Sequence, residues 1–223
     1  MTNLLDNRLK CIYDMVDKNI VDVGTDHGKL VVQLLLDKKI SKAICTDISQ
    51  SSLQKAKTLI KEQNLQDSCE FFVGDGLAVL KKDYSDYMAV IAGMGGMQII
   101  KILSASRQDN ITDFVLQPMK NVILLRQWLT NNGYKIDADV MTKQGNMFYN
   151  ILKVSAGQQQ LNNLELLFGI TNLQQPNEYF VEYITQEEQK FCAIVSNKSC
   201  NDDRVKDYYK AVSQVLLQIK GDK

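Results

Sequence analysis

Short apolar segments alternate with longer amphipathic segments along the first two thirds of the chain. One amphipathic segment, Ser52–Ile60, repeats apolar residues on a single helical face. The short segments are nearly continuous runs of apolar and β-branched residues, as expected for parallel strands buried on both faces. This alternation predicts βαβ units that build a doubly wound sheet. The predicted strands are Ile20–Val23, Ala43–Thr46, Cys69–Val73, Met88–Ala92 and Asp113–Leu116.

The pattern changes at both ends of this region. Tyr134–Met141 and Met147–Val154 are strand-like and are joined by Thr142–Asn146, so we expect an antiparallel hairpin that closes the edge of the sheet. Before the first strand, apolar residues recur every three or four positions from Leu4 to Val16, which predicts an amphipathic helix.

The last third of the chain has a different composition. Gly157–Gln160 is polar and linker-like, and Pro176 with Asn177 marks a helix start. Apolar residues then repeat at helical spacing on either side of a plausible turn at Asn197–Asp202. We therefore expect an α/β domain over residues 1–155 and an antiparallel helical hairpin within residues 156–223.

Composition places the chain among globular proteins. Of its 223 residues, 45% are hydrophobic and 23% are charged, and no apolar run approaches the ~20 residues that span a bilayer. The five cysteines are scattered without a Cys-x-x-Cys pair, which argues against a disulfide framework or a zinc site. We expect a cytoplasmic protein without a metal. The balance of 26 basic and 26 acidic residues does not by itself indicate a nucleic-acid partner, but it permits a local basic face.

The turn after the first predicted strand contains the main candidate chemistry. Gly24 permits a tight backbone turn, and Gly28 permits a close approach at the helix start. The loop lacks the Gly-x-Gly-x-x-Gly spacing of dinucleotide sites, which disfavours a nicotinamide dehydrogenase. Asp22, at the strand end, instead suits a ligand with a cationic amino-acid group, although an ordinary strand–helix turn would have a similar composition.

Acidic residues also end the next two predicted strands. Asp47 can accept both hydroxyls of a ribose or cap the following helix. Asp75 can accept a bond from an adenine amino group or belong to a simple turn. Because ligands bind outside the carboxyl ends of such strands, three consecutive acidic strand ends favour S-adenosylmethionine as the cofactor.

A glycine-rich loop, Ala92–Gly96, follows the fourth strand at the expected switch point of the sheet. Its glycines leave the backbone free to contact flat ligands on either side, unless the segment is only a flexible loop. The predicted cofactor-binding residues are Asp22, Gly24, Asp26, His27, Gly28, Asp47, Ile48, Asp75, Gly76, Ala92, Gly93, Met94 and Gly95.

These segments resemble a known family. Five segments are similar, in their order and spacing, to the bacterial TrmK family of tRNA (adenine-N1)-methyltransferases. They are Asp22–His27, Gly74–Leu77, Ala92–Gly96, Leu116–Pro118 and Arg126–Leu129. The resemblance covers residues 1–155, and the tail agrees in kind with the helical coil of that family. It implies a class I Rossmann-like methyltransferase fold, tRNA as the partner and adenine 22 as the target. Three positions depart from the family pattern, namely Lys29, Val31 and Asn150.

The implied reaction assigns roles to further residues. Methylation of adenine N1 leaves a cationic base, so a carboxylate near the reacting edge would stabilise that charge or accept a proton from N6. Asp26 is the catalytic candidate. His27, the only histidine, either shares the site or packs at the helix start. Residues expected on the substrate side are Gly96, Gln117, Pro118 and Arg126.

The predicted helical tail has two possible functions. A paired or stacked adenine must be extruded before its N1 can react, so another surface has to hold the RNA. Basic residues of the tail could meet phosphates, or they could form a solvated face together with nearby acidic residues. The basic residues are Lys190, Lys198, Arg204, Lys206 and Lys210. We expect the protein to be a monomer.

Other functions are compatible with parts of this pattern. A methyltransferase of another RNA, a small molecule or a protein would share the same cofactor half. A non-catalytic RNA-binding module would bind tRNA without S-adenosylmethionine, and the three acidic strand ends argue against it.

Overall fold

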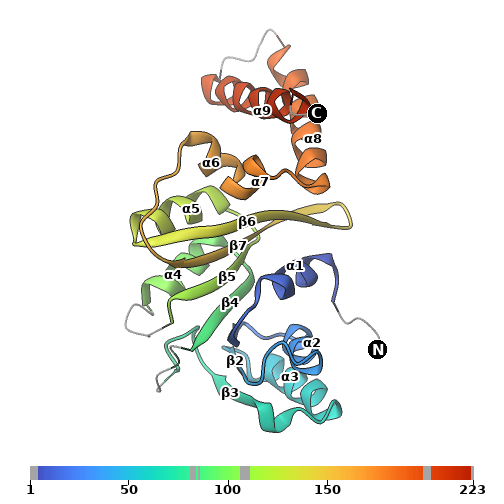
Figure 1. Ribbon diagram of the computed structural model, residues 1–223, viewed down its shortest axis with the longest axis vertical. Coiled ribbons are helices and arrows are strands. Elements are labelled where there is room, and N and C mark those ends of the chain that lie inside the picture. The colour runs from blue at the N-terminus through green and yellow to red at the C-terminus, as the bar shows by residue number, and fades with distance from the viewer. Residues whose placement is uncertain (1–4, 81–83, 85, 106–110, 198–201, 222–223) are drawn as a thin grey trace.

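A seven-stranded mixed sheet runs through the protein in the order β3-β2-β1-β4-β5-β7-β6 (Figure 1). The computed structural model describes residues 5–80, 84, 86–105, 111–197 and 202–221. Strands β1 to β5 are parallel, and β7 pairs antiparallel with both β5 and β6. The strands are β1 (Asn19–Val23), β2 (Ala43–Asp47), β3 (Cys69–Val73), β4 (Tyr87–Met94), β5 (Asp113–Pro118), β6 (Tyr134–Gln144) and β7 (Met147–Ala156).

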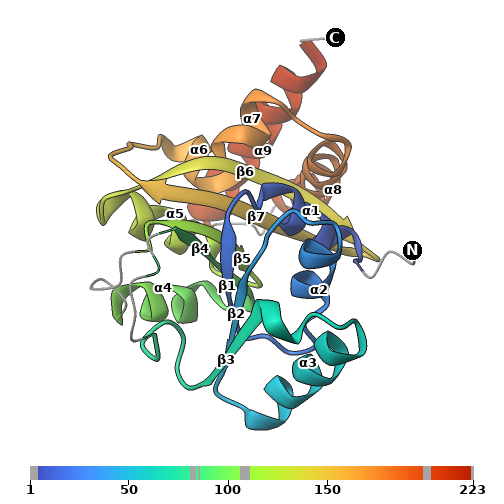
Figure 2. The same ribbon diagram turned by 60° about the horizontal axis from the view of Figure 1, so that its bottom comes forward.

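Helices cover both faces of this sheet, as the alternation of segments predicts (Figure 2). One face packs against α1 (Asn7–Met15), α2 (Lys29–Leu36) and α3 (Gln50–Glu62), and the other against α4 (Gly96–Ala105) and α5 (Val122–Asn131). Successive β4 residues point to opposite faces, so Val90 belongs to the core under α1–α3 and Ile91 to the core under α4 and α5. The Rossmann-like α/β fold is confirmed.

Local sequence accounts for the helix boundaries. Ser49 caps α3 by accepting the Ser52 N–H at 3.3 Å, and Leu53, Ala56 and Ile60 form its buried face. Helix α1 begins after Asp6, whose carboxylate accepts the Leu9 N–H at 2.8 Å. The predicted N-terminal helix is therefore present, although Leu4, with which we expected it to begin, lies outside the described residues.

Two details of the sheet differ from the sequence prediction. Strand β3 is not buried on both faces, because it is an edge strand whose residues are all half-buried or exposed. The hairpin loop is shorter than predicted, since β6 continues to Gln144 and only Gly145 and Asn146 turn the chain. Gly145 has φ of 59°, a conformation that favours glycine, so a two-residue turn replaces the expected five-residue connection.

The tail contains the predicted pair of long helices, α8 (Glu178–Val195) and α9 (Asp203–Gly221), and two short helices that were not predicted. Asn177 caps α8 by accepting the Phe180 N–H at 2.9 Å. The short helices are α6 (Asn163–Phe168) and α7 (Ile170–Gln174). A third apolar core joins the tail to Met141 of β6. Most of the predicted turn between α8 and α9, including residues 198–201, lies outside the described residues.

Candidate active site

A cleft of about 570 Å³ opens at the carboxyl ends of β1, β2 and β4, beside the loop that follows β3. The parallel strands all point their carboxyl ends to this edge of the sheet, which is where such sheets bind ligands. Most of the predicted cofactor-binding residues line the cleft together. They are Asp22, Gly24, Asp26, His27, Gly28, Asp47, Ile48, Asp75, Gly76, Ala92, Gly93 and Met94.

The loop between β1 and α2 forms one wall of the cleft. The Gly24 and Thr25 N–H groups both donate to the Thr46 carbonyl, at 2.8 and 3.1 Å, so β2 fixes the start of the loop. Gly24 has φ of 79°, and a Cβ there would lie 2.5 Å from the Met94 side chain. A side chain at position 24 would therefore strain the backbone and push Met94 from the cleft wall.

Asp22 lies at the bottom of the cleft. The Thr25 hydroxyl is 2.9 Å from its Oδ2. Desolvation by the surrounding protein raises the pKa of the Asp22 carboxyl to about 6, the neighbouring Asp47 carboxylate raises it further, and the Thr25 hydrogen bond opposes the shift. A desolvated carboxylate with one hydrogen bond has a strong capacity to bind a cation.

Asp47 is the last residue of β2, and Asp75 follows β3. Asp47 Oδ1 accepts the Ser49 N–H at 2.7 Å, whereas the cap of α3 is Ser49 itself. The carboxylate of Asp47 therefore orders the turn after β2 and retains further lone pairs facing the cleft. Asp75 lies between Gly74 and Gly76 in the loop after β3 and lines the cleft.

Asp26 and His27 lie at the mouth of the cleft. Asp26 Oδ2 is 3.2 Å from His27 Nε2, and its Oδ1 is 3.7 Å from Lys55 Nζ of α3. The Asp26 side chain is 62% exposed, so these contacts leave it accessible to a second molecule. Two cationic or proton-bearing neighbours position the carboxylate without enclosing it.

Three of the predicted substrate-side residues lie outside the cleft lining, next to the glycine loop. Gln117 is fully buried, and its Oε1 accepts the Gly93 N–H at 3.1 Å. Pro118 ends β5, and Gly96 begins α4 against the backbone of Lys120 and Asn121. Gly95 also lies outside the cleft lining. These residues support the loop that carries Gly93 and Met94 rather than face the cavity themselves.

We expected Arg126 on the substrate side, and its side chain lies outside the cleft lining. Its side chain is fully buried, and its Nε donates to Asp139 Oδ2 at 2.6 Å. Its Nη1 donates to the carbonyls of Leu166 and Leu167 in α6, and its Nη2 to Asp139 and Asn150. All five N–H donors have protein partners, so Arg126 links the tail to the sheet.

Arg8 is a cleft residue that sequence reasoning missed. It comes from α1, lines the cleft, and its Nη1 donates to Gln117 Oε1 at 2.8 Å. Gln117, 109 residues after Arg8 in the sequence, therefore connects Arg8 to the Gly93 N–H. The only signal was the amphipathic helix before β1, which does not reveal which side chain reaches the cleft. Lys29, one of the family departures, also lines the cleft.

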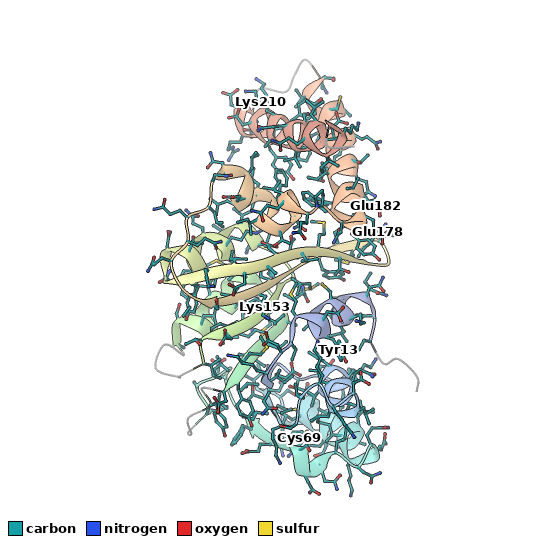
Figure 3. All side chains as sticks on the ribbon, in the orientation of Figure 1. Tyr13, Cys69, Lys153, Glu178, Glu182 and Lys210 are labelled. Carbon is teal, nitrogen blue, oxygen red and sulfur yellow. The ribbon has the colours of Figure 1, made fainter. Side chains whose placement is uncertain are left out.

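The basic residues of the tail are close to acidic residues of the same helices. Lys190 pairs with Glu187, Lys206 with Asp203, and Lys210 with Asp207, at 2.9–3.3 Å. Arg204 pairs with Asp202 at 2.8 Å, and Lys198 lies outside the described residues. Lys210 lies on α9, far from the sheet (Figure 3). Exposed pairs of this kind contribute little to stability, so phosphates can displace them.

The described residues contain no group of three or more His, Cys, Asp or Glu side chains placed to hold a metal ion. In the same part of the chain, no helix has the length and apolar character to cross a membrane.

Comparison with known proteins adds to this geometry. The profile of the TrmK family, described as tRNA (adenine(22)-N(1))-methyltransferase, matches residues 20–220. A Bacillus subtilis tRNA (adenine(22)-N(1))-methyltransferase is 30% identical over 83% of this chain and 82% of its own. The crystal structure of the B. subtilis m1A22 tRNA methyltransferase TrmK superposes with a TM-score of 0.79 and 26% identity, covering 95% of this chain and 98% of its own.

A second solved structure contains a cofactor. Streptococcus pneumoniae Sp1610 in complex with S-adenosyl-L-methionine superposes with a TM-score of 0.83 and 27% identity, covering 94% of this chain and 98% of its own.

Proposed function

The chain belongs to the TrmK family of S-adenosylmethionine-dependent tRNA (adenine(22)-N1)-methyltransferases, and we propose that the cleft at the ends of β1, β2 and β4 is its active site. The observation that supports this proposal is the convergence of Asp22, Asp47, Asp75 and Asp26 on one cavity. Asp22 and Asp47 lie at the carboxyl ends of β1 and β2, Asp75 lies in the loop after β3, and Asp26 lies at the mouth.

The carboxylates of the cleft match the polar groups of S-adenosylmethionine. The half-buried Asp22 carboxylate suits the α-ammonium group, Asp47 suits the ribose hydroxyls, and Asp75 suits the adenine amino group. Gly24 keeps the cleft wall open where a Cβ would meet Met94. When bound, the cofactor supplies an electrophilic methyl group on a sulfonium.

The protein contributes position and charge to the transfer. Adenine N1 already has a lone pair, so the reaction needs alignment more than a strong base. We propose that Asp26 stabilises the cationic product base or accepts a proton from N6, and that His27 and Lys55 hold its carboxylate at the mouth. The hydrogen bond between Arg8 and Gln117 holds the loop that carries Gly93 and Met94.

Cofactor affinity should depend on pH through Asp22. The pKa of this carboxyl is about 6 in the free enzyme, so protonation below that value removes the charge that pairs with the ammonium group. We expect the dissociation constant for S-adenosylmethionine to rise roughly tenfold from about pH 7 to about pH 5, as measured by calorimetry.

Protonation of Asp22 has the opposite effect on the stability of the fold. Because the pKa of its carboxyl is raised in the folded protein, protonation stabilises the folded state relative to the unfolded state. That stabilisation is complete below about 3.8 and is lost as the pH rises through about 6.

Two variants separate this effect from other titrations. Asp22→Asn should bind the cofactor weakly and without the pH dependence. His27→Asn removes the only histidine and should keep the dependence of the wild type. If His27→Asn abolishes the dependence, the titrating group is the imidazole and not Asp22.

The reaction itself is tested with unmodified tRNA transcripts. Purified protein and S-adenosylmethionine should produce 1-methyladenosine at position 22, located by mass spectrometry of nuclease fragments. The same transcript with guanosine at position 22 is the control and should accept no methyl group. A product at another nitrogen or position would overturn the substrate but not the cofactor.

We propose that residues 1–155 form the cofactor-binding domain and residues 156–223 a helical domain that contacts tRNA, in a monomeric cytoplasmic protein. Support for the tRNA-binding role comes from the exposed basic residues of α8 and α9, whose ion pairs with neighbouring acids are weak.

Neutralising the tail should therefore weaken tRNA binding selectively. In a variant with Lys190, Arg204, Lys206 and Lys210 changed to Gln, we expect a higher dissociation constant for tRNA and an unchanged one for S-adenosylmethionine. The slope of log K against log salt should fall by roughly one unit for each phosphate that the variant no longer neutralises. The matched control changes Glu187, Asp202, Asp203 and Asp207 to their amides and should not weaken binding. Unchanged salt dependence in the first variant would mark the tail as purely structural.

A further inference from the structure

Exposed aliphatic side chains gather beside the cleft, on the segments that begin α4 and α5. Met97 is 54% exposed, Met119 45%, Ile123 40% and Leu124 48%. Exposed apolar groups that cluster beside a cleft mark a surface used for recognition. None of the four lines the cleft itself, so bound cofactor would not cover them.

Hydrogen bonds hold these two segments together at the edge of the cleft. The Met119 N–H donates to the Met94 carbonyl at 2.8 Å, and the Gly96 N–H donates to the Lys120 carbonyl at 2.9 Å. A Cβ on Gly96 would lie 2.7 Å from the Asn121 carbonyl oxygen, so glycine permits this close approach. The contact between the two segments starts at Met94, which lines the cleft, and continues outward to Met97 and Met119.

Positive charge accompanies the aliphatic groups. The Lys120 side chain lies across the glycine loop, with its Cε 3.3 Å from the position that a Cβ on Gly95 would take. Within the described residues, its ammonium group forms no ion pair with a carboxylate. Asn121, the residue before α5, adopts φ of 60° and makes no side-chain cap bond, so the first N–H groups of α5 have no such partner. A lysine next to an uncapped helix start attracts anions.

We propose that this lip, made of Met97, Met119, Lys120, Ile123 and Leu124, inserts into the tRNA base stack and occupies the space that the extruded target adenine leaves. The inference rests on the proposed function, because the target nitrogen lies on the Watson–Crick edge and is reached only by an extruded base. Proteins that unstack nucleic-acid bases insert Met, Leu or Ile side chains between them, with basic residues on the adjacent phosphates. The lip combines both kinds of side chain within reach of the cleft.

Charge argues against a second copy of this chain as the occupant. In a two-fold symmetric dimer over the lip, the same patch would meet itself, and Lys120 would approach Lys120 of the other copy. RNA provides the opposite charge.

The test uses tRNA with 2-aminopurine in place of adenine 22, a base that fluoresces more strongly when it is unstacked. Bound to wild-type protein with S-adenosylhomocysteine, this tRNA should show a fluorescence increase. In a Met97→Ala and Leu124→Ala double variant, most of that increase should disappear. Methyl transfer to normal tRNA should slow roughly tenfold or more, since the variant no longer offsets the cost of unstacking. The dissociation constant for S-adenosylmethionine should not change.

Met147→Ala is the matched control, because Met147 is a methionine on β7 that is 53% exposed and lies outside both the lip and the tail. It should keep both the fluorescence increase and the rate. An undiminished fluorescence increase in the double variant would overturn the proposal, as would a wild-type dimer that the double variant dissociates in analytical ultracentrifugation. The proposed function fails separately, if wild-type protein transfers no methyl group to adenine 22.

Discussion

Asp26→Asn should lower the rate of methyl transfer by roughly 10²-fold or more and leave the affinity for S-adenosylmethionine nearly unchanged. The amide keeps the size of the carboxylate but cannot carry a negative charge or accept a proton from N6. Asp26 lies at the mouth of the cleft and is 62% exposed, whereas Asp22 lies at the bottom, where it suits the cofactor. We therefore expect the Asp26 carboxylate to act on the reacting base and not on the cofactor.

The measurement that isolates this effect is a single-turnover rate at saturating tRNA and cofactor, together with calorimetry for cofactor binding. Lys55→Gln is the matched control, because it removes a neighbour 3.7 Å from Asp26 without changing the carboxylate. We expect its rate to fall by much less. A near-normal rate for Asp26→Asn would exclude Asp26 from the mechanism, and a matching loss of cofactor affinity would reassign it to cofactor binding.

Much of the fold could be predicted, because burial on both faces produces a strong sequence pattern. β1, β2, β4 and β5 are inner strands and appear as continuous apolar runs. β3 has a similar composition, yet it is an edge strand, and an apolar run does not reveal how many neighbours a strand has. α6 and α7 are too short for an apolar period, although the capping box of Asn162 and Glu165 was a readable signal for α6.

The acidic side of the cleft was also predictable, since the carboxyl ends of parallel strands must meet at one edge. The contribution of Arg8 was not, because it depends on how α1 packs across the strand ends. The surroundings of Arg126 also depend on packing. We expected it on the substrate side, and the face of α5 on which it lies points toward β6 and the tail.

The second large effect concerns this buried arginine. Arg126→Met should lower the free energy of unfolding by about 3–5 kcal/mol, because it leaves the fully buried Asp139 carboxylate without its ion-pair partner. Chemical denaturation with urea measures the change. The Arg126→Met and Asp139→Leu double variant removes both charges and should recover a large part of the loss.

The same variants decide between a structural and a substrate role for Arg126. Its guanidinium reaches the Leu166 and Leu167 carbonyls at the end of α6, so its removal should loosen the tail from the sheet. Gly169, which follows α6, has φ of 87°, and a Cβ there would lie 2.6 Å from the Asp139 carboxyl carbon. The backbone of the tail therefore packs directly against the ion pair between Arg126 and Asp139. If Arg126 only anchors the tail, the double variant should bind S-adenosylmethionine and tRNA like the wild type wherever it is folded. A folded and stable double variant that fails to bind tRNA would show instead that the arginine serves the substrate.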